Sequence, residues 1–141
     1  MAVSITVPDE YGYVVCVLFL AYAAFFFLAE MVVYARKKFD VPYPTMYSEK
    51  SKQFNCYQRG HQNALESLPF FLVFTLLGGL QHPLVVSVAG VVWCVGRIVY
   101  ALGYYSGDAS KRAPGAILAF LALVAIFGCS VSLALHMLDI L

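Results

Sequence analysis

Long apolar segments are the feature that most constrains how this chain of 141 residues can fold. A helix needs about 20 mostly apolar residues to cross a hydrocarbon core of roughly 30 Å, so four spans would use most of the length. The composition agrees, because 62% of the residues are hydrophobic and 12% are charged, whereas a soluble domain averages about 45–50% apolar and 25% charged residues. We therefore predict a single all-α membrane domain over residues 1–141, built as a bundle of four transmembrane helices.

Polar and proline-containing stretches separate the apolar segments. Arg36-Lys37-Lys38 ends the first segment, and Pro42 and Pro44 in the following loop oppose helix continuation. Ser48 is the expected N-cap of the second helix, which at roughly 32 residues would measure about 48 Å. Because this exceeds the hydrocarbon thickness, its polar N-terminal part should project beyond the core or line a polar cavity. The expected spans are residues 13–34, 48–80, 84–105 and 114–138.

The distribution of positive charge predicts the orientation. Eight of the nine basic residues lie in or beside the first and third connections between spans. With an even number of spans, these two connections share one side of the membrane, which the positive-inside rule assigns to the cytosol. Both termini are then expected on the lumenal or exterior side. The eight residues are Arg36, Lys37, Lys38, Lys50, Lys52, Arg59, Lys111 and Arg112.

A dense polar run, residues 54–66, leads directly into an almost wholly apolar segment. If the run is helical, Arg59, Asn63 and Glu66 sit at i, i+4 and i+7 and share one face. A cation, an amide and a carboxylate at the edge of an apolar segment are costly unless they meet a partner. That partner is either another helix or a ligand that carries charges of both signs.

The third apolar segment carries a second stripe, formed by Arg97, Tyr100 and Tyr104, near the same membrane face. An ionisable residue inside a span is costly unless paired, so it marks a candidate functional site. The residues alone favour a plainer role for Arg97, namely a structural ion pair, with Glu30 as the expected partner, or a contact with a carbonyl group. Tyr100 and Tyr104 fit an interfacial aromatic belt equally well.

The histidines and cysteines do not predict a metal site. His61 has no second histidine at a metal-ligand spacing, and His82 and His136 fall at the predicted opposite side. The four cysteines are widely spaced and form no Cys-x-x-Cys motif, so neither a disulfide framework nor a zinc site is expected.

The two polar stripes and the basic loop residues should converge on one cytosolic-side layer of the bundle. Several cations, one acid and two phenols suit a small zwitterionic ligand with more than one carboxylate. Guanidinium groups bind carboxylates bidentately, and a glutamate can hold an ammonium group. The residues do not by themselves name the ligand. Those expected to converge are Arg36, Arg59, Asn63, Glu66, Tyr100, Tyr104 and Arg112.

The order of the motifs resembles that of the MAPEG family, the membrane-associated proteins of eicosanoid and glutathione metabolism. The resemblance covers nearly the whole chain, with ordered motifs in three separate places. The central one is Phe-Asn-Cys-x-Gln-Arg-x-His-Gln-Asn-x-x-Glu at residues 54–66. Before it lie Ala35-Arg36-Lys37-Lys38 and Pro42-x-Pro44-x-Met46-Tyr47. After it lie Gly96-Arg97-x-x-Tyr100 and Gly103-Tyr104-Tyr105-x-Gly107-Asp108-x-x-Lys111-Arg112.

The resemblance implies a homotrimer in the endoplasmic reticulum membrane. Glutathione, the implied co-substrate, would bind between adjacent subunits near the cytosolic face, and no metal or nucleic acid is implied. His61 falls where relatives often have glutamine, so it is an expected glutathione-binding residue. The other residues that the resemblance assigns to glutathione are Arg36, Arg59, Asn63, Glu66, Tyr100 and Tyr104.

The implied catalytic residue is Arg112, with the adjacent Lys111 as the alternative. A thiol with a pKa of about 8.5 is mostly protonated at neutral pH, and a guanidinium beside the sulfur favours the anion. The implied activity is that of a glutathione S-transferase and peroxidase acting on lipid hydroperoxides or lipophilic electrophiles, with leukotriene A4 among the candidates. The alternatives are a non-catalytic relative that presents lipid to a partner enzyme and, less favoured, a transporter or channel.

Overall fold

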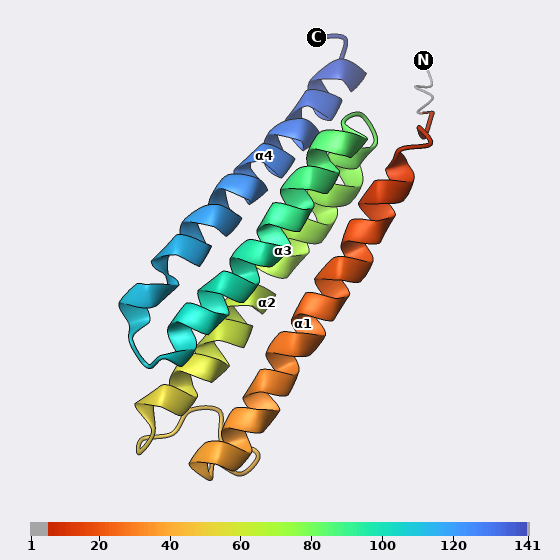
Figure 1. Ribbon diagram of the computed structural model, residues 1–141. Helices are drawn as coiled ribbons and strands as arrows, with labels where there is room; N and C mark the ends of the chain where they lie inside the picture. Colours follow the sequence, from red (N-terminus) through yellow and green to blue (C-terminus); the bar gives the residue numbers. More distant parts are fainter. Residues whose placement is uncertain (1–5, 141) are drawn as a thin grey trace.

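The computed structural model describes residues 6–140, and all of their regular structure is helical. The long helices are α1 (Tyr11–Phe39), α2 (Lys52–Gly79), α3 (Pro83–Tyr105) and α4 (Ala113–Met137), and a short 3-10 helix, η1 (Ala109–Arg112), leads into α4. The long helices lie side by side in an elongated bundle (Figure 1). The prediction of an all-α fold is therefore confirmed for the described part of the chain.

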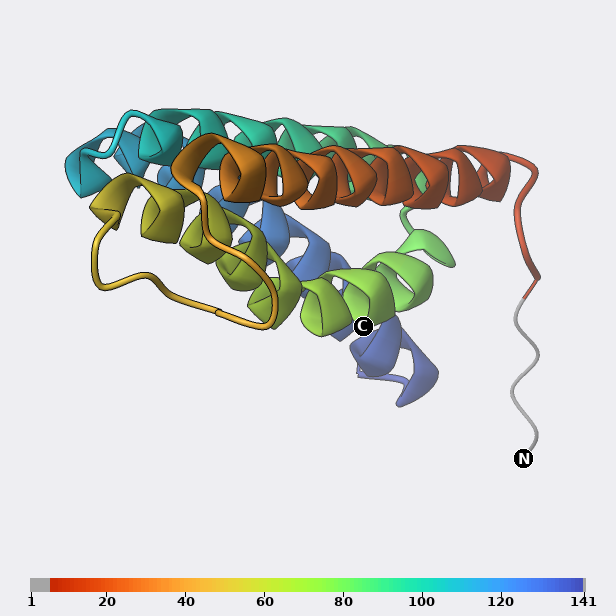
Figure 2. The ribbon, with the colours of Figure 1, turned by 90° about the horizontal axis from the view of Figure 1, so that it is seen from below.

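Successive long helices run in opposite directions, so the connections alternate between the two ends of the bundle (Figure 1). The α1–α2 loop and the α3–α4 connection lie together at what we call the loop end, residues 40–51 and 106–112. The α2–α3 turn, residues 80–82, lies with the start of α1 and the end of α4 at what we call the terminal end. Figure 2 shows the same grouping from below. α2 and α3 each pack against both α1 and α4.

Three segments are long and apolar enough to cross a membrane: α1, α3, and Ala109–Met137, which joins η1 to α4. α2 does not join them, because its first half carries the polar run at residues 54–66. Three of the four expected spans are therefore found by length and apolarity, and the position of the N-terminal part of the second helix relative to the hydrocarbon stays a prediction. The composition and the three apolar helical segments are those expected of a membrane protein, and the orientation of the bundle stays a prediction.

The first helix extends beyond its expected end at residue 34. It includes Arg36, Lys37 and Lys38 and ends at Phe39. Cations are favourable near a helix C-terminus because they face the unpaired carbonyl groups there, so the basic run prolongs the helix. Asp40 then turns the chain with a left-handed φ of 52°, and its N–H donates to the carbonyl of Arg36.

The second helix begins later than expected, and the prediction that Ser48 is its N-cap was wrong. The cap is Ser51, whose hydroxyl oxygen accepts a 3.2 Å hydrogen bond from the N–H of Phe54. Ser48 is held in the loop by Asn55, whose side chain bonds both its N–H and its carbonyl, at 2.7 and 2.8 Å. The Ser48 hydroxyl accepts hydrogen bonds from the N–H groups of Lys50 and Ser51, both at 3.2 Å, so it closes a turn of the loop and does not cap the helix.

Aromatic stacking joins the helices at two levels. Trp93 of α3 stacks on Phe71 of α2 with ring centroids 3.8 Å apart, and Phe25 of α1 lies 6.2 Å from the same indole. Nearer the loop end, Tyr57 of α2 stacks on Tyr105 of α3 at 3.9 Å. Such pairs add about 0.5–1.5 kcal/mol beyond the apolar area that they bury. They hold α2 and α3 at a fixed rotation, which decides where the polar faces of both helices meet.

Glycines bring α3 into backbone contact with α4. A Cβ on Gly96 would lie 2.7 Å from the backbone nitrogen of Ala119, and one on Gly115 would lie 2.5 Å from the Cα of Tyr100. Gly103 meets the carbonyl of Lys111 in the same way. Because no side chain fits at these positions, α4 and η1 lie directly against the end of α3 that carries the tyrosines.

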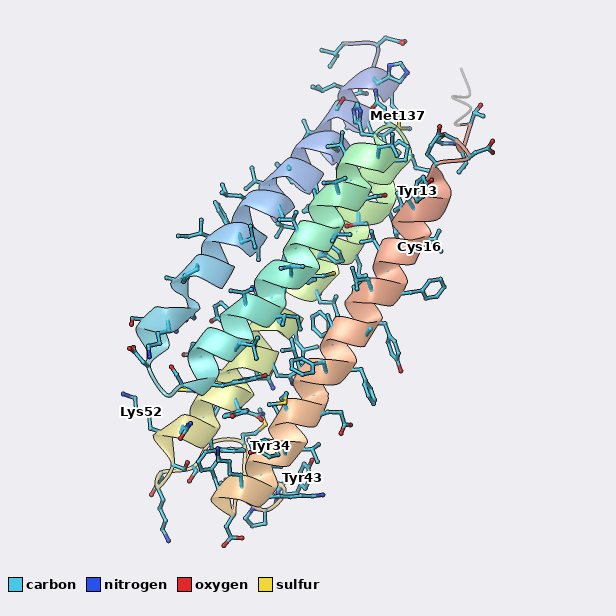
Figure 3. All side chains as sticks on the ribbon, viewed as in Figure 1. Tyr13, Cys16, Tyr34, Tyr43, Lys52 and Met137 are labelled. Carbon is cyan, nitrogen blue, oxygen red and sulfur yellow. The ribbon has the colours of Figure 1, made fainter. Side chains whose placement is uncertain are left out.

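Large apolar side chains are exposed on the outer faces of the bundle. Phe19 of α1 is 70% exposed and Phe120 of α4 is 65% exposed. Figure 3 marks Tyr13 near the terminal end of α1 and Tyr34 near its loop end, and both are at least half exposed. Water-facing surfaces rarely carry such continuous apolar area. These faces suit contact with lipid or with another subunit.

Candidate functional site

The polar stripe of α2 forms a connected network near the loop end. Arg59 and Glu66 form an ion pair with Nη1–Oε1 and Nη2–Oε2 distances of 2.9 and 3.5 Å. Asn63 lies between them on the helix and donates from Nδ2 to Oε2 of Glu66 at 3.4 Å. The three predicted residues thus share one face, as their spacing requires.

Arg97 extends this network from α2 to α3. Its Nη2 donates to Oδ1 of Asn63 at 2.6 Å. The expected pair between Arg97 and Glu30 does not form, because the Glu30 side chain is exposed on α1 and Asn63 takes the guanidinium. Among residues 6–140, the single ion pair is the one between Arg59 and Glu66.

A ladder of cations and phenol rings connects Arg97 to Arg112. The Arg97 guanidinium lies 4.9 Å from the ring centre of Tyr100, and the Tyr100 and Tyr104 rings are 5.6 Å apart. Arg112 lies 5.1 Å over the Tyr104 ring and donates from Nη1 to its hydroxyl group at 2.8 Å. The second stripe and the predicted catalytic residue therefore belong to one continuous arrangement.

The loop before α4 fixes the position of Arg112. Gly107 has a left-handed φ of 83°, which reverses the chain after α3. Asp108 then caps η1, since its Oδ1 accepts hydrogen bonds from the N–H and the hydroxyl of Ser110 at 2.9 and 2.7 Å. These bonds to the charged form hold the pKa of the Asp108 carboxyl below its usual value. Lys111 is exposed in the same turn, and its carbonyl packs on Gly103.

A groove of about 360 Å³ opens beside the network, between α2, α3 and α4. Asn63, Glu66, Arg97 and Tyr100 line its polar part. Farther from the loop end it meets an apolar trough of about 260 Å³ between α2 and α4. Phe70, Phe120 and Leu123 border both hollows, and the trough is lined further by Phe74, Val124 and Phe127.

Two of the predicted residues, Arg36 and His61, do not join this network within one chain. Arg36 is 8% exposed and donates from Nη1 to the carbonyls of Val41 and Thr45 at 3.3 and 2.8 Å, so it ties down the α1–α2 loop. Its Nε has no hydrogen-bond partner among the described residues. His61 lies on the opposite side of α2, in an apolar groove shared with α1 side chains such as Phe25.

Sequence reasoning missed two parts of the site. The first is the hydrogen bond from Arg97 to Asn63. A cation in an apolar span indicates that a partner exists, but the sequence does not show which residue it is. The second is the trough that Phe70, Phe74, Phe120 and Phe127 line. Phenylalanines in a membrane span look alike in sequence whether they face lipid, the core or a groove, so no signal was present. Within residues 6–140, no three His, Cys, Asp or Glu side chains gather closely enough to hold a metal ion.

Comparison with known proteins assigns the chain to a family. The model of the MAPEG family matches residues 14–132. The chain is also similar to the uncharacterized protein sll1147 of Synechocystis sp., with 35% identity over 101 residues, which covers 70% of this chain and 72% of that protein. The residues that the family model matches contain the polar run of α2, the tyrosine stripe of α3 and Arg112. The chain belongs to the MAPEG family.

Proposed function

We propose that this protein is a membrane-bound glutathione S-transferase and peroxidase, most like microsomal glutathione S-transferase 3. The MAPEG family includes glutathione transferases and related proteins of lipid metabolism. The observation that carries the proposal is the contact of Arg112 with Tyr104, 2.8 Å long, beside a network that offers charges of both signs. An exposed arginine held in this way has a defined position from which to act on a bound sulfur.

The network matches the charges of glutathione, which carries one ammonium group, two carboxylates and a thiol. Arg59 can bind a carboxylate bidentately, and Glu66 can accept hydrogen bonds from the ammonium group. In the free chain these two side chains neutralise each other at 2.9 Å. Ligand binding would replace that surface ion pair, which is worth only about 0–1 kcal/mol, with two pairs between protein and ligand.

Arg112 would activate the thiol. Its guanidinium favours the thiolate over the thiol when the sulfur lies beside it, and each unit by which the pKa falls corresponds to about 1.36 kcal/mol. In the transferase reaction, the thiolate attacks an electrophilic carbon and forms a C–S bond. The bond from that carbon to the leaving group breaks as the leaving group takes the electron pair; in an epoxide such as leukotriene A4 this is a ring C–O bond, whose oxygen then takes up a proton. In the peroxidase reaction, it attacks the terminal hydroperoxide oxygen, giving a lipid alcohol and a glutathione sulfenic acid. A second glutathione converts the sulfenic acid to the disulfide and water.

The apolar trough supports a lipophilic second substrate. It runs between α2 and α4 from the polar groove, and Phe120 on its border is 65% exposed on the outer face of the bundle. An acyl chain from the bilayer can therefore enter sideways, with its reactive group toward the loop end. Lipid hydroperoxides and leukotriene A4 both have the required long apolar chain and a reactive oxygen function.

The positions of Arg36 and His61 support a site shared between subunits. Both are glutathione-binding residues by resemblance, yet within one chain they lie away from the network formed by Arg59, Asn63 and Glu66. In the proposed homotrimer, the α1 side of one subunit supplies Arg36 and His61 to the network of the next. We place the assembly in the endoplasmic reticulum membrane with the loop end toward the cytosol, since that end carries most of the basic residues.

The test is glutathione-dependent turnover by detergent-purified protein, with a lipid hydroperoxide and a model electrophile. Arg112→Ala is compared with Lys111→Ala, which removes the neighbouring cation. A loss of at least tenfold for Arg112→Ala alone, about 1.4 kcal/mol, with glutathione binding retained, would support the proposal. The same loss for Lys111→Ala alone would move the catalytic role to that residue. Wild-type protein that binds glutathione without turnover would favour the lipid-presenting alternative.

A further inference from the structure

Arg97 is an unusually placed cation. It is 6% exposed and lies in α3, a segment apolar enough to cross a membrane. A charge in this setting is costly unless it is paired with a carboxylate or held by several acceptors. Arg97 instead donates to the neutral amide of Asn63, and its Nε has no partner among residues 6–140. Its remaining neighbours include the Tyr100 and Trp93 rings, 4.9 and 5.9 Å away.

This contact fixes the orientation of the Asn63 amide. A guanidinium can only donate hydrogen bonds, whereas an asparagine side chain has an accepting oxygen and a donating nitrogen on opposite sides. Because Arg97 selects the oxygen at 2.6 Å, the nitrogen must point the other way, to Oε2 of Glu66 at 3.4 Å. A flipped amide would turn its oxygen toward the carboxylate and repel it.

Glu66 is therefore held from two sides. Arg59 donates to its carboxylate from two turns earlier in α2. Asn63, which Arg97 orients, donates to it from one turn earlier. The Glu66 side chain is 57% exposed, so without these contacts a long and mobile carboxylate would have many rotamers to lose on binding. When the ligand draws Arg59 away, the contact with Asn63 is the one that stays.

We propose that Arg97 is a positioning residue, which acts through Asn63 to hold the Glu66 carboxylate at the rim of the groove, where it receives the ammonium group of glutathione. This inference rests on the proposed function. It assigns Arg97 an effect on one group of the ligand and no contact with the ligand itself. The relay consists of Arg97, Asn63 and Glu66.

The test uses two thiols: glutathione, and the analogue that lacks the α-amino group of the γ-glutamyl residue. For wild type we expect a higher kcat/KM with glutathione than with the analogue. Arg97→Met should raise KM for glutathione about tenfold, the effect of one charge-assisted contact, and change kcat little. With the analogue its KM should stay near the wild-type value, so that the preference for the amino group collapses.

Three further variants sharpen the result. Arg97→Lys retains a cationic donor for Oδ1 of Asn63 and should restore part of the preference. Asn63→Asp preserves an acceptor for Arg97 but removes the donor to Glu66, and should abolish the preference even if Arg97→Met fails to fold. Lys52→Met removes an exposed cation near the loop end without touching the relay, and should behave as wild type.

Each outcome bears on a different claim. If wild type prefers glutathione and both Arg97→Met and Asn63→Asp keep that preference, the positioning role is wrong while the proposed function stands. If Arg97→Met loses the same factor with both thiols, Arg97 contacts a group that both share, which also overturns the relay. If wild type neither binds glutathione nor distinguishes the two thiols, the proposed function itself fails.

Discussion

The two ends of the bundle hold polar groups of different kinds. At the terminal end, neutral side chains tie the helices to one another: Tyr11 donates to the carbonyl of Leu76 at 3.0 Å, and His82 pairs with Ser132 at 2.9 Å. At the loop end, charged side chains gather around a groove, and the buried Nε of Arg97 has no partner within the described chain. Buried polar groups normally find partners. The terminal end also has a buried oxygen without one, on Gln81, but that group is neutral, whereas the loop end leaves part of a cation without a partner.

This difference indicates which end of the bundle is the better candidate for a functional site. Satisfied neutral pairs contribute about 0.5–1.5 kcal/mol each to stability and need nothing further. A charged side chain beside a groove lowers stability when some of its hydrogen-bond donors have no acceptor. A bound ligand could supply the missing acceptors. Natural proteins accept such local conflicts mainly at functional sites. We therefore propose that a ligand binds at the loop end, and we expect the terminal end to be structural.

The largest effect should come from the contact that joins α3 to α4. In Gly115→Ala the added methyl group meets the backbone of Tyr100, so α4 must move and carry Arg112 away from Tyr104. A displacement of about 1 Å at a reacting group can cost about 100-fold in rate, and the melting temperature should also fall. Gly128→Ala in the same helix meets nothing within 4 Å and is the matched control. Wild-type turnover by Gly115→Ala would contradict this account.

Removing the acid of the network should have the next largest effect. Glu66→Gln retains the shape but loses the charge that pairs with an ammonium group, so KM for glutathione should rise about tenfold. Glu49→Gln removes an exposed carboxylate from the same end and should leave KM unchanged. Steady-state kinetics with the model electrophile measures both. Equal effects of the two substitutions would mean that KM depends on the overall charge of this end and not on Glu66 in particular.

The trough should affect lipid selection more weakly. Phe120→Ala removes a ring that borders the groove and the trough, and should raise KM about fivefold for a long-chain hydroperoxide because apolar contact area is lost. A short-chain hydroperoxide should be unaffected. Phe19→Ala is the control, since that ring is similarly exposed, at 70% against 65%, on α1. Chain-length selection that survives in Phe120→Ala would place the lipid elsewhere.

The smallest effect on activity belongs to the terminal end. His82→Ala removes the hydrogen bond to Ser132 and should lower the free energy of unfolding by about 1 kcal/mol, with turnover unchanged. Thermal unfolding in detergent and the peroxidase assay measure the two quantities on the same preparation. A clear loss of turnover with unchanged stability would show that the two ends are not separate in function.

Much of the fold was accessible from the sequence because it follows from periodicity and apolarity. The helical stretches and the shared face of Arg59, Asn63 and Glu66 depend only on residue type and spacing. The cap of α2 was mispredicted because Ser48 and Ser51 are equally suitable by type, and the choice between them is made by Asn55. Only a tertiary contact could settle that.

The site was partly accessible for the same reason. Charges in apolar surroundings marked Arg97 and the α2 stripe, but the pairing of Arg97 with Asn63 in place of Glu30 depends on how α2 and α3 are rotated. The stacking of Trp93 on Phe71 sets that rotation. Arg36 was expected with the ligand-binding residues, and its use by the α1–α2 loop could not be read from its spacing.

The most direct test of the central claim is the pKa of the glutathione thiol when bound to the protein. The ultraviolet absorbance of the thiolate, followed against pH, measures it in wild type and in Arg112→Ala under conditions where both bind glutathione. We predict a bound thiol pKa at least one unit below the free value of about 8.5 in wild type, and a return toward that value in Arg112→Ala. A bound thiol that titrates like free glutathione in the wild type would contradict thiolate activation by Arg112.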